Sequence, residues 1–420
     1  MTYYGEETKK ASQNFALEFR RVNIKLIHAL VLVKKSAAMS LAEVEGGEIF
    51  PAVVSACDDV LAGKHDDQFI TDALQGGAGT STHMNVCEVL SALATEKLGK
   101  SVHPLDDVNK GQSTNDVYPT ALRVAAIKLL RVLSEECAKL QEALQKSENS
   151  YGGIRKLART ELVPALATTM GDVFGAWAQA ISRDRWRLYK IEERLRQVNL
   201  GGTMIGGGDG AKRQYRYLVI ENLRGLSGIG FAYAEYPADL TQNNDVFVEV
   251  SGLLKALAVN LMKISNDLRL QQLLGEIKLA PLQAGSTIMP GKVNPVIPEM
   301  VMQTAIRIIA DDTALTNAAS HGELELNAFM PLIADSLLEM LELLINAVRL
   351  FREKCIDLIV INKEMCEQLL ANSNALAFDY VEKLGYEKVA ALVREFANDP
   401  QLLQSKLTEA YEALEQHNGN

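Results

Sequence analysis

The chain has 420 residues, of which 48% are hydrophobic and 23% are charged. At roughly 150 residues per domain this length predicts two or three units, and the balanced composition excludes wholesale disorder. Lysine and arginine number 43 against 53 aspartate and glutamate residues, so the formal net charge is −10. This charge argues against a nucleic acid backbone or an anionic membrane as the main partner. A small anionic ligand would need a local cluster of donors.

The cysteines and histidines give no sign of a metal or disulfide framework. Five cysteines form an odd set without a CxxC pair, and six histidines contain no HExxH or HxH pattern. The segment GGGDG lacks the strand–helix setting of a dinucleotide site. The first residues, MTYYGEETKK, lack the apolar core of a signal peptide, and no apolar run near them approaches the ~20 residues that span a bilayer. We therefore expect a cytoplasmic protein that needs no metal, cofactor or membrane.

Long helical patterns dominate the chain, and alternating strand-like runs are scarce. Between about 244 and 277, apolar residues recur with spacings of 4, 3, 4, 4, 3 and 4, which draws one face of a helix. Similar patterns occupy 168–199 and 299–361, the latter with a break at Pro331. Helices this long are typical of a bundle or a coiled coil, and helices apolar nearly all round are buried on all sides. The pattern predicts an all-α fold whose long helices also contact partner subunits.

Polar segments rich in glycine, serine, threonine and asparagine separate these helices. They span residues 75–85, 109–116, 199–210 and 282–295. One donor cluster is Ser113, Thr114 and Asn115, and another begins at Thr80. Helix capping is the common role of such residues, and Thr114 or Asn115 can cap a helix that opens at Val117. Because helix N-termini also bind anions, several clusters in one chain predict a site of neutral donors for a small polyanion.

The segment GSTIMPGKVN, Gly285–Asn294, combines two glycines and a proline with four polar side chains. Glycine and proline together predict a loop that moves but closes in few conformations. Ser286 and Thr287 supply hydroxyls, Lys292 a cation and Asn294 an amide. Lysine and asparagine together can hold a carboxylate. The alternative is a surface loop whose lysine points into water.

These segments carry a family resemblance. GSTIMPGKVNPVIPE resembles GSSxMPxKxNPxxxE, the signature loop of the fumarase/aspartase superfamily. The blocks YYGEETKKASQNF, QGGAGTSTHMN, QSTNDVYPT, TQNNDVFVEVSGLLK, ISNDLRL and GELELN resemble the other family blocks and follow the family's order. The likeness covers nearly the whole chain and is strongest to the aspartate ammonia-lyases of this superfamily.

The resemblance implies an all-α, fumarase/aspartase-like fold of three domains. We expect an N-terminal domain at 1–112, a central long-helix domain at 113–362 and a short C-terminal domain at 363–420. In this family the central domains of a homotetramer form a twenty-helix bundle, and three subunits contribute to each active site. The family reaction is a reversible anti-elimination that gives an alkene such as fumarate and releases ammonia or another leaving group.

The resemblance also implies roles for individual residues. Ser286 matches the base that removes the proton next to a carboxylate. A free serine hydroxyl holds its proton at pH 7, so Lys292 and the loop amides would have to stabilise the alkoxide in a site that excludes water. The other matches are substrate contacts: Thr80, Ser113 and Thr114 to the aci-carboxylate dianion, Thr160, Lys292 and Asn294 to the second carboxylate, and Asn115 to the leaving group. One such donor contributes roughly 2.7–4 kcal/mol to lowering the barrier.

The chain departs from the family pattern beside the substrate. The block GRTHLQDAxP reads ARTELVPALA, so Glu161 replaces a histidine, and Glu299 matches the glutamate that partners this histidine. If both carboxylates stay near each other, one titrates high, or a cationic substrate group lies between them. His83 stands where asparagine is usual and either moves an imidazole into the site or packs locally. GST replaces GSS at Thr287, and LRLQQLLGEIKL is shorter than its aspartase counterpart.

These features predict a carbon–nitrogen lyase that acts on aspartate or an aspartate-like amino acid. Glu161 keeps open a betaine substrate, as in the trimethylamine-releasing ergothionases. A fumarate hydratase is a further alternative, which the lost histidine disfavours. A non-catalytic structural relative is disfavoured because the serine–lysine loop is intact.

Overall fold

The computed structural model describes residues 2–418. The chain divides into two compact units. The first comprises the residues up to Glu135, Asp184–Val259 and Thr304–Asn346, and the second comprises Glu136–Arg183, Asn260–Gln303 and the residues from Ala347 onward. The three domains expected from the sequence stay a prediction.

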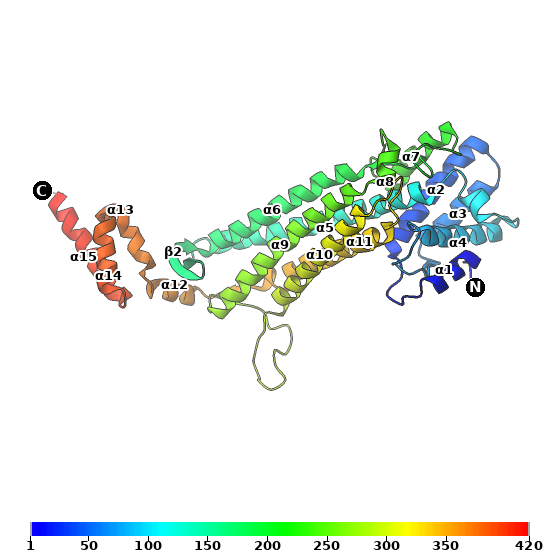
Figure 1. Cartoon of the computed structure of the whole chain (residues 1–420). Helices are drawn as coiled ribbons and strands as arrows, with labels where there is room; N and C mark the ends of the chain where they lie inside the picture. Colours follow the sequence, from blue (N-terminus) through cyan, green and yellow to red (C-terminus); the bar gives the residue numbers. More distant parts are fainter. Residues whose placement is uncertain (1, 419–420) are drawn as a thin grey trace. The chain divides into compact units, whose positions relative to one another are not determined.

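Five long helices contribute residues to both units (Figure 1). They are α5 (Thr114–Ser150), α6 (Met170–Leu195), α9 (Asp245–Leu273), α10 (Val296–Ser320) and α11 (Met330–Lys354). Helices α6 and α9 confirm the patterns at 168–199 and 244–277. The pattern at 299–361 becomes α10 and α11, and Pro331 stands at the second residue of α11, where a helix tolerates proline. Helix α5 begins at Thr114, three residues before the expected start at Val117, and it contains Pro119.

The remaining elements of the first unit are shorter. Its helices are α1 (Glu6–Asn14), α2 (Ile24–Glu45), α3 (Ile49–Leu61), η1 (Asp66–Gln68), α4 (Thr80–Leu98), η2 (Pro104–Val108), α7 (Arg213–Ser227) and α8 (Pro237–Gln242). Helix α2 is buried along most of its length because α3 and α7 pack against it. The strands β3 (Gln197–Val198) and β4 (Ala232–Tyr233) form a short parallel pair.

The second unit holds the longest strands. The hairpin of β1 (Arg155–Thr160) and β2 (Val163–Thr169) is antiparallel, with a register shift between Leu157 and Arg159. The strands β5 (Ile277–Lys278) and β6 (Val360–Ile361) form a second antiparallel pair. The remaining helices are η3 (Ile356–Leu358), α12 (Lys363–Ala371), η4 (Asn374–Tyr380), α13 (Val381–Leu384), α14 (Tyr386–Phe396) and α15 (Pro400–Asn418). Buried Val389, Leu403 and Leu407 hold η4, α14 and α15 together.

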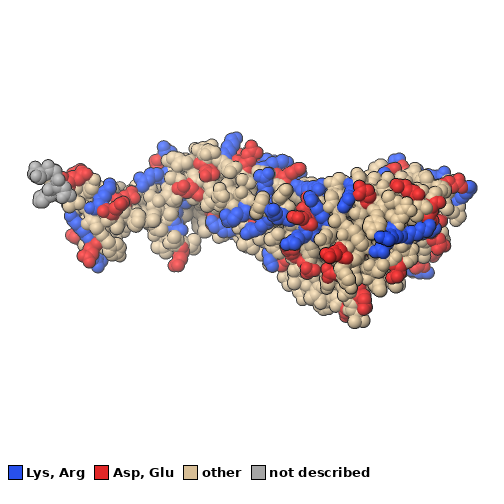
Figure 2. Space-filling model, turned by 90° about the horizontal axis from the view of Figure 1, so that it is seen from above, with Lys and Arg blue, Asp and Glu red and all other residues tan. Residues whose placement is uncertain are grey.

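Basic and acidic side chains both occur over the face drawn in Figure 2, which fits the modest negative net charge. Within residues 2–418, no helix combines the length and apolar composition needed to cross a bilayer.

Candidate active site

The residues predicted for the site fall into two groups, each inside one unit. The first unit holds Thr80, His83, Ser113, Thr114 and Asn115. The second unit holds Thr160, Glu161, Ser286, Thr287, Lys292, Asn294 and Glu299.

A capping box opens α5 in the first unit. The Ser113 N–H donates to Asp116 Oδ1 at 2.9 Å, and Ser113 Oγ accepts from the Asn115 N–H at 3.2 Å. This reciprocal pair satisfies N–H groups that a helix start leaves free. The expectation that Thr114 or Asn115 caps a helix at Val117 is therefore wrong, because both lie inside α5 and Ser113 is the cap. The Thr114 and Asn115 side chains are left for other partners.

Asp116 ties a distant loop to the start of α5. Its Oδ2 accepts from the N–H groups of Gly201 at 2.9 Å and Thr203 at 3.0 Å. Burial raises the pKa of Asp116 to about 6, although these N–H donors and the charge of Lys34 oppose the shift. The buried carboxylate thus fixes the glycine-rich segment against the donor cluster.

His83 contacts Thr114 from α4. Its Nδ1 lies 2.8 Å from Thr114 Oγ1, and only 2% of the histidine is exposed. Burial, and secondly the charge of Lys34, lower the pKa of His83 well below its ordinary value. Its Nε2 is buried without a hydrogen-bond partner among the described residues. Thr80, the first residue of α4, is exposed and donates to the Gly77 carbonyl at 2.7 Å.

Asn115 is held on the other side of Thr114. Its Nδ2 donates to the Met204 carbonyl at 2.8 Å, and its backbone carbonyl accepts from Asn199 Nδ2 at 3.0 Å. Thr114 and Asn115 line a cavity of about 10 Å³ together with Asn244, which is room for about one water. Asn244 is buried, and its Nδ2 has no partner within the described structure.

Sequence reasoning missed Asn244 and Lys34. Asn244 lies in the block TQNNDVFVEVSGLLK, which carried the resemblance without a role for this amide. Lys34 ends the apolar run LIHALVLVK and is fully buried. Its Nζ donates to Asn109 Oδ1 at 2.6 Å, and burial lowers its pKa. Nothing local in the sequence distinguishes a buried lysine from a solvated one.

The serine loop in the second unit extends away from the helix ends that it connects (Figure 1). Ser286 Oγ accepts from the N–H groups of Ile288 at 3.2 Å and Met289 at 3.0 Å. Asn294 Nδ2 donates to the Gly285 carbonyl at 2.7 Å. A Cβ at Gly285 would clash with the Lys292 carbonyl, so the neck of the loop requires glycine here. Lys292 and Thr287 are exposed.

The hairpin tip of β1 and β2 carries Thr160 and Glu161. Glu161 and Leu162 form its two-residue turn with φ of 53° and 65°, a left-handed conformation that non-glycine residues rarely adopt. On β1, Lys156 and Arg159 pair with Glu276 at 2.9 Å and 2.8 Å. The three also line a cavity of about 580 Å³, partly walled by Trp177 and Leu270.

Glu161 and Glu299 differ in their exposure to solvent. Glu161 is exposed and Glu299 is half-buried. The facing carboxylates expected from the sequence stay a prediction.

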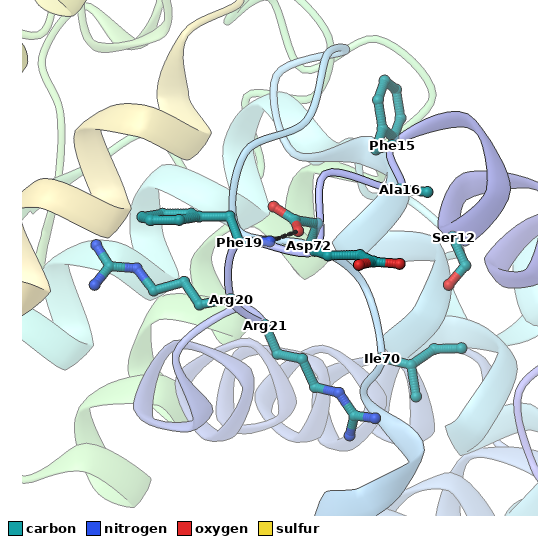
Figure 3. A pocket seen from close by; sticks show the side chains of 9 residues that line it. Ser12, Phe15, Ala16, Phe19, Arg20, Arg21, Ile70 and Asp72 are labelled. Atoms are coloured by element: carbon teal, nitrogen blue, oxygen red, sulfur yellow. Dashed lines mark hydrogen bonds between the residues drawn. The ribbon is translucent and has the colours of Figure 1, made fainter.

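A further hollow of about 420 Å³ lies in the first unit (Figure 3). Arg20 borders it, but Asp335 and Glu339 pair with this arginine, so its charge is already neutralised. Asp72, on the same hollow, accepts from the Phe19 N–H at 3.3 Å. None of the predicted site residues lines it. The described residues contain no group of three or more His, Cys, Asp or Glu side chains that could hold a metal ion.

Comparisons with known proteins agree over nearly the whole chain. The family model described as Lyase matches residues 2–310. The chain is 38% identical to an aspartate ammonia-lyase of a Bacillus species over 406 residues, which covers 94% of this chain and 87% of the relative. It is 39% identical to the aspartate ammonia-lyase of Escherichia coli K12 over 387 residues, with coverages of 88% and 81%.

Solved structures show the same fold. A fumarate lyase:delta crystallin from Brucella melitensis bound to cobalt superposes with a TM-score of 0.93 at 37% identity, covering 99% of this chain and 96% of that one. A class II fumarase from Schistosoma mansoni superposes with a TM-score of 0.92 at 28% identity, with coverages of 97% and 92%. The predicted all-α, fumarase/aspartase-like fold is confirmed.

Proposed function

This chain belongs to the lyase family, and we propose that it catalyses the reversible anti-elimination of ammonia from aspartate or an aspartate-like amino acid. The products are a fumarate-like alkene and the free amine. Relatives at 38–39% identity that are aspartate ammonia-lyases support ammonia as the leaving group.

The geometry of Ser286 carries the proposal. Two backbone N–H groups already donate to its Oγ, and such donors favour the anionic form of an acceptor. Lys292, six residues on in the same loop, would add a positive charge when the loop closes over a substrate. Together they lower the cost of a serine alkoxide, which takes the proton next to the substrate carboxylate.

The donors of the other unit complete the reaction. Removing the proton places a second negative charge on that carboxylate, and Thr80, Ser113 and Thr114 donate to it. The electron pair of the new double bond expels the amine from the opposite face, toward Asn115. Lys292, Asn294 and Thr160 hold the second carboxylate, while Glu161, Thr287 and Glu299 border the substrate.

We propose that the chain forms a homotetramer with sites shared between three subunits, as the family resemblance implies. Large apolar side chains exposed on the long helices support this assembly: Val132 on α5, Trp186 and Tyr189 on α6, Val259 on α9 and Ile306 on α10. Light scattering should give four times the chain mass. Five free, buried cysteines fit a reducing cytoplasm, which we propose as the location.

The direct test incubates the enzyme with aspartate and follows fumarate absorbance together with ammonia. Ser286→Ala should lower kcat by about 10²–10⁴-fold, the usual contribution of a general base. Gln283→Ala, an exposed change in the same segment, is the matched control and should leave kcat intact. Full turnover by Ser286→Ala would remove Ser286 from the mechanism.

The same assay separates the alternatives. Release of trimethylamine from a betaine without turnover of aspartate would identify a betaine lyase, and malate formed from fumarate would identify a hydratase. If none of these substrates is turned over, the remaining alternative is a non-catalytic structural relative. The aspartate ammonia-lyase relatives favour none of these three outcomes.

A further inference from the structure

The hydrogen bond between His83 and Thr114 has a direction, and this direction decides what Thr114 offers a substrate. A hydroxyl that donates to the histidine presents only lone pairs elsewhere, whereas a hydroxyl that accepts keeps its proton free. Thr114 is half-buried and lines the small cavity beside Asn115, while His83 is buried behind it. The cavity side is therefore where a free proton would point.

The partners of the ring favour one direction. His83 is buried and faces the charge of Lys34, and both factors favour a neutral ring with a single N–H. If the proton were on Nε2, a buried N–H would have no acceptor among the described residues. If it is on Nδ1, only an acceptor lone pair is left unpaired, which proteins tolerate more readily than an unpaired donor. The Nδ1–H then donates to Thr114 Oγ1.

We propose that His83 is a positioning residue, which donates to Thr114 Oγ1 and thereby turns the Thr114 hydroxyl into a hydrogen-bond donor toward the substrate carboxylate. This inference rests on the proposed function, in which Thr114 stabilises the aci-carboxylate. It assigns His83 no contact with the substrate, because the ring is buried within one chain. The capping box holds the backbone N–H groups of Ser113 and Asn115 on either side of Thr114, whereas His83 contacts the Thr114 hydroxyl itself.

A double-mutant cycle tests the inference. His83→Leu should lower kcat/KM for aspartate by about 10–100-fold, and Thr114→Val by at least as much, as expected for a donor to an oxyanion. In the Thr114→Val background, His83→Leu should change kcat/KM by less than about 2-fold, because there is no hydroxyl left to orient. His83→Asn should recover most of the activity, since the asparagine Nδ2 takes nearly the place of the histidine Nδ1. His65→Leu, a histidine outside the donor cluster, is the control and should match the wild type.

Two outcomes overturn the inference. The first is that His83→Leu lowers kcat/KM as much in the Thr114→Val background as it does in the wild type. The second is that His83→Asn has a kcat/KM as low as that of His83→Leu. If His83→Leu does not fold, the comparison of His83→Asn with His83→Gln replaces it, because the longer side chain moves the amide away from Oγ1 and should impair catalysis.

The affinity for succinate, an unreactive dicarboxylate, separates this inference from the proposed function. A wild type that neither converts aspartate nor binds succinate refutes the proposed function, and with it the role of Thr114. If the wild type converts aspartate and binds succinate but the effects of His83→Leu and Thr114→Val are additive, only the role of His83 is refuted.

Discussion

Replacement of Glu276 by glutamine should destabilise the second unit strongly. Glu276 is fully buried and pairs with Lys156 and Arg159, which are 7% and 17% exposed. The substitution keeps the volume of the side chain but leaves two cations without a countercharge. Removing one partner of a buried pair costs about 3–5 kcal/mol, and we expect about 3 kcal/mol because the glutamine carbonyl can still accept from Arg159.

Tryptophan fluorescence can follow this loss inside the second unit. The chain has two tryptophans, and Trp177, buried in the second unit, donates to Asp267. In a Trp186→Phe background, the remaining Trp177 reports urea unfolding of this unit. Glu276→Gln should move the midpoint to lower urea with an unchanged slope.

Two controls decide whether the buried charge is responsible. Glu409→Gln removes one partner of the exposed pair with Lys406 in the same unit, and it should leave the midpoint unchanged. In a Lys156→Met background, Glu276→Gln should lower the free energy of unfolding by at least about 1 kcal/mol less than it does when Lys156 is present, because one of the two unpaired cations has been removed. If Glu276→Gln lowers the free energy of unfolding by less than about 1 kcal/mol in the Trp186→Phe background, the reasoning is refuted. Because Arg159 adjoins Thr160, kcat/KM should also fall.

Three further predictions concern titration, backbone strain and thiol burial. Asp116 has a folded pKa of about 6, above its ordinary ~3.9, so its protonated form stabilises the folded state below about pH 4 and this stability is lost as the pH rises through 6. The stability of the wild type relative to Asp116→Asn should therefore fall by about 2 kcal/mol between pH 4 and 7 in urea titrations, and a constant difference would contradict the shift. Leu162→Gly should raise the midpoint of thermal unfolding, because Leu162 is 73% exposed and has a φ of 65°. Glycine relieves about 1–2 kcal/mol of backbone strain, which exceeds the entropic cost of fixing a glycine in the folded state. A lower midpoint would show that Leu162 packs in the assembly. All five cysteines are buried, and burial raises the pKa of Cys355 to about 12 and of Cys366 to about 11. A thiol reagent should therefore react slowly with the native enzyme and should label all five cysteines after unfolding in urea. Rapid labelling of the native enzyme would show that a thiol is accessible.

Local sequence patterns were sufficient for the long helices and the polar segments. The apolar spacing at 244–277 predicted α9 because a helix brings every third or fourth residue to one face. The loop GSTIMPGKVN, with its serine, lysine and asparagine, was recognisable without coordinates because its residue types and order are specific. Proline disfavours a helix interior, yet Pro119 stands within the first two turns of α5.

Only the tertiary structure decided how the site residues are held. Asp116 meets Gly201 and Thr203 across more than eighty residues, and His83 meets Thr114 across thirty-one. Such partners are set by the packing of whole elements, which local periodicity does not encode. The same holds for Lys34, a lysine at the end of an apolar run that the structure buries completely. The sequence by itself thus determined which side chains are available for chemistry, and the tertiary structure decided their partners, because burial and long-range hydrogen bonds exist only after the helices have packed.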